Sequence, residues 1–194
     1  MRVLDNSSIV NVYRVASPEG KIRIILANYS NFISIVNAYE CGLADTINEE
    51  RIYNRRKAMG DLGVRVQSST MSNPTATEGE SFSSIINAVR EGDYITALKG
   101  ADRYEEHKAE ILTLRHMRKT YKHVSNQLGC LGDRYKPFMS YIMHETDLAE
   151  IAEAEGVTVE AIKQRFRKAK KIVIKGAVHW IDEQMDYFVL EKGA

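Results

Sequence analysis

DLAEIAEAEGVTVEAIKQRFRKAKKIVIK, residues 147–175, is the stretch that decides the fold, because its pattern predicts two helices joined by a short turn. Thr146 is expected to cap the first helix through its hydroxyl. One face of that helix carries apolar residues at helical spacing, namely Leu148, Ile151 and Ala152. Gly156 supplies the left-handed backbone conformation that a tight turn between helices needs. Together these features predict a helix-turn-helix.

The second helix, predicted over residues 159–174, has two different faces. Thr158 is a good N-cap for it. Its apolar stripe consists of Ile162, Phe166, Ala169 and Val173. About 180° from that stripe lie Glu160, Lys163, Gln164, Arg167 and Lys171. A helix that docks by its apolar face would therefore present these polar side chains outward together.

The positive charge of the chain is concentrated on this second helix. Residues 160–175 contain one anion, Glu160, and seven cations: Lys163, Arg165, Arg167, Lys168, Lys170, Lys171 and Lys175. Their balance is +6 while the whole chain carries +1, so the remaining residues sum to −5. Charge placed in this way is what contact with DNA phosphates requires, although a solvated basic face is the alternative explanation.

We predict that this helix lies in the major groove of double-stranded DNA. The residues expected to face base edges are Glu160, Lys163, Gln164 and Arg167. Those expected nearer the phosphates are Arg165, Lys168 and Lys171. Thr158 and Val159, at the start of the helix, complete the predicted DNA-binding set.

Residues 133–171 resemble region four of bacterial sigma factors, in which a Leu-x-x-Ile-Ala-x-x-x-Gly-Val-Thr pattern precedes a basic recognition helix. The match rests on Leu148, Ile151, Ala152, Gly156, Val157 and Thr158. Glu155 departs from the pattern, which usually has an apolar residue closing the turn there. We expect the first helix to pack more loosely at this point, or the Glu155 side chain to bend towards solvent.

A second resemblance covers residues 63–79, GVRVQSSTMSNPTATEG. This segment is similar to the Ser-Asp-Pro-Thr-Ala linker of small phage regulators of the ArpU and RinA type, which resemble sigma factors at their C-termini. Asn73 takes the place of the Asp. The resemblance implies a sequence-specific activator of late or transfer genes on a phage or another mobile element.

The chain as a whole predicts a mainly α fold with a small β-hairpin near the N-terminus. The hairpin is expected from residues 8–15, which are rich in β-branched side chains, a Ser-Pro-Glu-Gly turn signal at residues 17–20, and residues 22–26. Helices are expected at residues 28–40 and 47–59. The predicted domains are an N-terminal part (1–66), a polar linker (67–80), a central helical region (81–130) and the helix-turn-helix domain (131–194).

A long central helix is expected between Tyr104 and Leu128. Its apolar stripe consists of Ile111, Leu114, Met117, Tyr121, Val124 and Leu128. This narrow stripe is either a coiled-coil seam that holds a homodimer or one face packed against the chain's own helices.

Two further helices should complete the C-terminal domain. Pro137, Phe138 and Ile142 indicate the first helix of a tri-helical unit. Residues 177–191 indicate a packing helix, and Trp180 lies off its apolar side, where an exposed ring would favour an interface.

Catalytic and metal motifs are not found in the sequence, so we predict no enzyme, no cofactor and no metal site. HExxH, Walker, GxSxG and CxxC patterns are all missing. His116, His123 and Cys130 recur every seven residues, but that spacing climbs about 10.5 Å along a helix and the side chains could not converge on one ion. Surface histidines are the better interpretation.

The cellular location is predicted from what the sequence lacks. It contains neither a signal peptide nor an apolar run long enough for a bilayer, and its two cysteines form no paired motif. We therefore expect a cytoplasmic protein without membrane contact.

Three functions use such a motif. The first is a transcription regulator that binds double-stranded DNA. The second is a sigma-like subunit that binds RNA polymerase, which would need a polymerase-contacting region that residues 1–130 do not reveal. The third is a DNA-recognition subunit of a phage packaging machine, similar to a small terminase, which usually carries the motif near its N-terminus.

Overall fold

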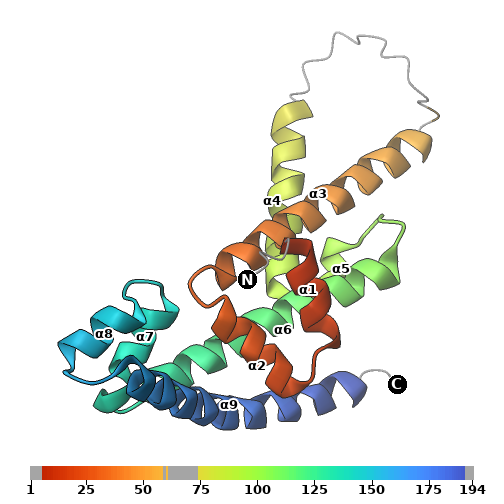
Figure 1. The fold of residues 1–194 in the computed structure, drawn as a ribbon. Coiled ribbons are helices and arrows are strands. Elements are labelled where there is room, and N and C mark those ends of the chain that lie inside the picture. Colours follow the sequence, from red (N-terminus) through yellow and green to blue (C-terminus); the bar gives the residue numbers. More distant parts are fainter. Residues whose placement is uncertain (1–5, 59, 61–73, 191–194) are drawn as a thin grey trace. The chain divides into compact units, whose positions relative to one another are not determined.

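The computed structural model describes residues 6–58, 60 and 74–190, with side chains for 9–58, 60 and 82–181, and these residues are mainly helical (Figure 1). The α-helices are α1 (Asn6–Val15), α2 (Pro18–Ala27), α3 (Phe32–Ala58), α4 (Pro74–Glu91), α5 (Tyr94–Ala97), α6 (Tyr104–Gly129), α7 (Lys136–Ile142), α8 (Leu148–Ala154) and α9 (Val159–Leu190). A short 3-10 helix, Asp133–Tyr135, precedes α7. Within the described residues, no helix is both long and apolar enough to span a membrane.

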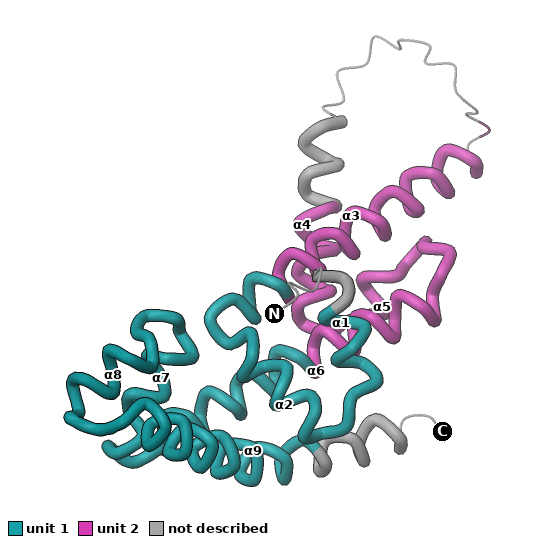
Figure 2. The backbone as a smooth tube through the Cα atoms, in the orientation of Figure 1, with its two compact units in different colours: residues 1–35, 117–194 teal, residues 36–116 magenta. Residues whose placement is uncertain are grey.

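The chain divides into two compact units (Figure 2). Unit 1 comprises Met1–Ile35 together with Met117–Ala194, and unit 2 comprises Val36–His116. Unit 1 therefore joins α1 and α2 to the C-terminal helices, which the sequence did not predict. The four-part domain division remains a prediction, because compactness does not test whether a segment folds alone.

The predicted β-hairpin is wrong, since both of its strands lie in helices, α1 and α2. The buried residues of α1 are Ile9, Val10 and Tyr13, and the buried apolar residues of α2 are Ile22, Ile25 and Leu26. Both sets follow helical spacing, so burial has overridden the β-propensity of the branched side chains. The supposed turn signal is a helix start, in which the Ser17 hydroxyl accepts a hydrogen bond from the Gly20 N–H at 3.2 Å and Pro18 occupies the first turn.

Two predicted boundaries in the middle of the chain also differ from the structure. Residues 32–40 and 47–58 of the two expected helices belong to one helix, α3, because buried Leu43 and Ala44 continue the apolar stripe across the supposed gap, while residue 59 lies outside the described part. The polar linker predicted over residues 67–80 is helical from Pro74, where α4 begins, and residues 67–73 lie outside the described part. Proline is well tolerated in the first turn of a helix, so a polar segment that contains it also suits a helix start.

The apolar stripe of α6 is buried within the chain itself. Ile111, Leu114, Met117 and Val124 have no exposed surface, and Leu128 is 2% exposed. The stripe is therefore not available as a coiled-coil seam, and the alternative, packing against the chain's own helices, is the one observed. His116 is also buried, so the interpretation of this residue as a surface histidine is wrong.

Aromatic and polar side chains tie α6 to the N-terminal helices of unit 1. The Tyr121 ring stacks on Phe32, with centroids 5.7 Å apart, and on Tyr29, with centroids 5.1 Å apart. The Tyr13 hydroxyl donates a buried hydrogen bond to the Thr120 hydroxyl at 2.9 Å. These contacts place residues that are about a hundred positions apart in sequence in one core.

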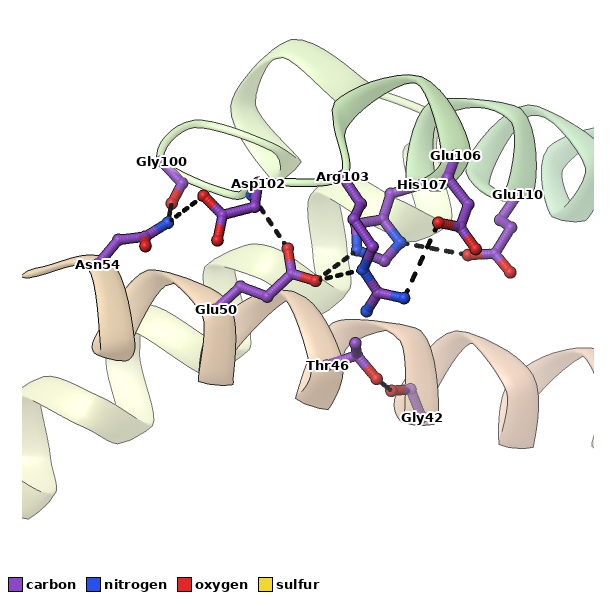
Figure 3. A network of polar contacts seen from close by, with 10 residues as sticks. All are labelled: Gly42, Thr46, Glu50, Asn54, Gly100, Asp102, Arg103, Glu106, His107 and Glu110. Carbon is purple, nitrogen blue, oxygen red and sulfur yellow. Dashed lines mark hydrogen bonds and ion pairs between the residues drawn. The ribbon is translucent and has the colours of Figure 1, made fainter.

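Unit 2 contains a polar network around the carboxylate of Glu50 on α3 (Figure 3). Its oxygens accept hydrogen bonds from the Arg103 guanidinium at 2.7 Å and the Asp102 backbone N–H at 3.1 Å, and Oε1 lies 3.1 Å from Nε2 of the buried His107. The other ring nitrogen of His107 lies 3.3 Å from Glu110. Burial raises the pKa of Glu50, but the hydrogen bonds from Arg103, His107 and Asp102 outweigh this and lower it to about 2.

Candidate nucleic-acid interface

The helix α8 begins with a capping box. The Asp147 carboxylate accepts hydrogen bonds from the backbone N–H groups of Ala149 at 2.7 Å and Glu150 at 2.9 Å. In return, the Glu150 carboxylate accepts from the Asp147 N–H at 3.1 Å. The N-cap is therefore Asp147 and not Thr146 as predicted, because an acidic cap with Glu at the third helical position satisfies donors at both ends of the box.

The turn after α8 has the backbone conformation expected from its glycine. Gly156 has a φ of +64°, and the Val157 N–H donates to the Ala152 carbonyl at 3.0 Å. The following helix is capped as predicted, since the Thr158 hydroxyl accepts from the Ala161 N–H at 3.2 Å. The two helices α8 and α9 are thus joined by a short, hydrogen-bonded connection.

The apolar stripe at the start of α9 is buried as predicted. Ile162, Ala169 and Val173 have no exposed surface, and Phe166 is 5% exposed. Phe166 packs against Phe138 and Tyr141 of α7, with both ring centroids 5.2 Å from its own. Ile151 and Ala152 of α8 are buried as well, so α7 and α8 hold the N-terminal half of α9 by its apolar face.

The opposite face of α9 is open to solvent. Its polar residues are all exposed: Glu160, Lys163, Gln164, Arg167 and Lys171. Thr158 and Val159 at the helix start and Lys168 further along are exposed too. Eight of the nine residues predicted to bind DNA are therefore exposed on or beside the start of α9, and their contact with DNA remains a prediction.

Glu160 holds two of the cations on that face. Its carboxylate oxygens lie 3.7 Å from the Lys163 ammonium and 3.6 Å from the Arg167 guanidinium. All three side chains are about half exposed or more, so each ion pair contributes little to stability. In the free protein, however, Lys163 and Arg167 both lie beside the Glu160 carboxylate. A phosphate or a base acceptor that binds either cation would have to replace this carboxylate as its partner.

Arg165 is the predicted site residue that lies apart from this surface. Its side chain is 16% exposed and forms an ion pair with Glu155, the last residue before the glycine of the turn. Glu155 is the position at which the sequence departs from the sigma-factor pattern. The Glu155 side chain does not simply turn to solvent. Its ion pair with Arg165 connects the end of α8 to α9, at the position where the sigma-factor pattern has an apolar contact.

The continuation of α9 was not foreseen. The helix predicted to end at residue 174 and the tail helix predicted at 177–191 are one helix, Val159–Leu190. Gly176 does not break it and instead allows close contact with α6, since a Cβ at this position would lie 2.2 Å from the side-chain oxygen of Gln127. Beyond it, Trp180 is 46% exposed and stacks on His123 of α6, with ring centroids 5.9 Å apart.

Two features of this region were not predicted. The first, the capping box of Asp147 and Glu150, is present in the local sequence, but the preceding threonine offered a competing cap. The packing of α2 against α9 joins segments more than 130 residues apart, and the sequence carries no signal for it.

Comparison with known proteins identifies no relative: no family model, no curated protein and no solved structure matches this chain. The resemblance to sigma factors and to small phage regulators therefore remains a prediction from short motifs.

Proposed function

We propose that this protein is a transcription regulator that binds double-stranded DNA in a sequence-specific manner. In this proposal α8 and α9 form a helix-turn-helix, α7 is the first helix of the tri-helical unit, and the N-terminal half of α9 enters the major groove. One observation carries the proposal: a face of α9 with exposed polar and basic residues lies opposite a stripe that is fully buried against α7 and α8.

The chemistry of this face suits the edges of base pairs. Arginine and lysine donate to guanine, glutamine pairs with adenine, and glutamate accepts from cytosine, and these are the side chains of Arg167, Lys163, Gln164 and Glu160. Lys168 and Lys171 are exposed further along the helix, where contact with phosphates would fix its register. The local balance of +6 in an otherwise acidic chain favours a polyanionic partner for this helix.

The wider biological assignment rests on the family resemblance. It implies an activator of genes on a phage or another mobile element. We also propose a cytoplasmic location, with RNA polymerase as a further partner and a homodimer as one arrangement. Binding to purified RNA polymerase without DNA would favour the sigma-like alternative, and a ring-sized assembly in solution would favour the packaging subunit.

The direct test is selection of bound fragments from the DNA of the host element, followed by titration of the selected site. Arg167→Ala should weaken specific binding by roughly 1–3 kcal/mol if this side chain reads a base. Lys171→Ala should weaken binding to all sequences alike. It should also lower the slope of the logarithm of the binding constant against the logarithm of the salt concentration by about one. Lys99→Ala removes an exposed lysine of unit 2 and should leave binding unchanged.

The outcome against the proposal is equally clear. If Arg167→Ala and Lys171→Ala bind the selected DNA as tightly as the unaltered protein, α9 is not the reading helix. Glu160→Gln adds a further readout, because it releases Lys163 and Arg167 from their anionic neighbour. It should strengthen non-specific binding and lose preference at one base pair if Glu160 accepts from cytosine.

A further inference from the structure

An open pocket of about 400 Å³ lies beside the N-terminal half of α9 and is lined by residues of α2, α7, α8 and α9 and by His144, which follows α7. All of these helices belong to unit 1. Small-molecule sites in proteins have volumes of roughly 300–1,000 Å³, so the pocket is large enough for a compact organic ligand.

The apolar part of the pocket is aromatic. Phe138, Tyr141 and Phe166 line it, and Phe166 lies within 5.2 Å of each of the other two ring centroids. Leu26 of α2 and Leu148 of α8 add aliphatic surface. These rings pack against one another and form an apolar wall of the pocket, against which a flat aromatic body can make stacked or tilted contacts.

The polar part of the pocket is cationic. Lys163, Arg167 and Lys170 line it at a spacing of four and three residues along α9, and the described lining residues include no aspartate or glutamate. Lys163 and Arg167 have Glu160 as a neighbour outside the pocket, whereas Lys170 forms no ion pair with another described side chain. A ligand with an acidic head group would meet these charges with no acidic group in the lining to repel it.

We propose that this pocket binds a small aromatic carboxylate, with its ring against the wall formed by Phe138, Tyr141 and Phe166 and its carboxylate against Lys170 and the neighbouring cations. The volume fits one or two fused rings, and a single anionic head matches a site whose lysines and arginine all lie on α9. A neutral ligand of the same shape would form no ion pair with these cations.

The site would also act on DNA binding, and this consequence rests on the function proposed above. Lys163 and Arg167 line the pocket and are also expected to reach base edges. A carboxylate bound against them would compete with DNA for the same charges. The ligand would then release the regulator from its site.

Binding can be tested without DNA. We suggest naphthalene-2-carboxylate as the probe and 2-naphthalenemethanol, its neutral counterpart, as the control, with both titrated into the full-length chain by calorimetry and by amide chemical shifts. The carboxylate should bind with shift changes in α7 and the first half of α9. The alcohol should bind at least about tenfold more weakly, since it cannot form a charge-assisted hydrogen bond.

Variants separate the two halves of the site. Lys170→Gln should weaken the carboxylate about tenfold and leave the alcohol unchanged. Lys168→Gln is the matched control, because Lys168 is on the same helix, is exposed and does not line the pocket. Tyr141→Ala should weaken both compounds, and circular dichroism should give unchanged helix content for all three variants.

The proposal is overturned if the carboxylate does not bind, if both compounds bind equally, or if Lys168→Gln weakens binding as much as Lys170→Gln. A competition experiment then addresses DNA: saturating carboxylate should lower the affinity for the selected site. Unchanged affinity would refute the competition while leaving the ligand site in place. A protein that binds the carboxylate but no DNA at all would refute the proposed function alone.

Discussion

Replacing Glu50 by glutamine should destabilise unit 2 near neutral pH, and the effect should disappear in acid. The folded state lowers the pKa of this carboxyl from 4.5 to about 2. A difference of about 2.5 pKa units corresponds to roughly 3 kcal/mol. The Glu50 side chain is only 15% exposed, but its partner Arg103 is 50% exposed, so solvent screening reduces the expected effect to about 2 kcal/mol.

The sign of the pH dependence follows from the direction of the shift. Because the folded pKa is lower than the unfolded one, the ionised carboxylate stabilises the folded state above about pH 4.5. This stabilisation is lost as the pH falls from about 4.5 towards 2. The difference between the unaltered protein and Glu50→Gln should therefore shrink across that interval.

Urea unfolding followed by circular dichroism at several pH values would measure this difference. Glu106→Gln is the matched control, since Glu106 also contacts Arg103, at 3.8 Å, but is 59% exposed. It should change the free energy of unfolding by less than about 0.5 kcal/mol. The reasoning is refuted if Glu50→Gln is as stable as the unaltered protein near neutral pH, or if its deficit is the same at about pH 3.

Other substitutions test the helix ends and turns. Asp147→Ala should destabilise unit 1 by about 1 kcal/mol in thermal unfolding because it removes the cap of α8, whereas an equal loss from Thr146→Ala would contradict the assignment of the cap. Gly156→Ala should lower the free energy of unfolding in urea by about 1 kcal/mol. The reason is the φ of +64°, which an alanine rarely adopts, since the space around the residue is open. Gly42→Ala, inside α3 and also in open space, should instead stabilise by about 0.5–1 kcal/mol, so a gain at Gly156 or a loss at Gly42 would argue against this account.

The parts of the fold that the sequence predicted are those decided by local periodicity and caps. The buried stripe of α9, the glycine of the turn and the Thr158 cap all depend on residues within a few positions of one another. Helical periodicity over such a span is a strong signal, and the face opposite the stripe follows from it by geometry.

The parts that the sequence did not predict depend on contacts between distant segments. Residues 8–26 have high β-propensity, yet α1 and α2 are helical because Tyr13 reaches Thr120 and α2 packs against α9. The sequence predicts two helices, over residues 159–174 and 177–191, where the structure has one, α9, because the contact of Gly176 with Gln127 cannot be read from local sequence. For the same reason the aromatic pocket was missed, since its lining comes from residues 26 to 170.

The unbroken course of α9 has a mechanical consequence. A helix of 32 residues is about 48 Å long, and it runs without a break from the segment that carries Arg167 to the segment that carries Trp180. A rotation or tilt of α9 near Trp180 would therefore also move the exposed face near the N-terminal end of the helix. A partner that binds α9 near Trp180 would therefore change the orientation of the exposed face around Arg167 without contacting that face.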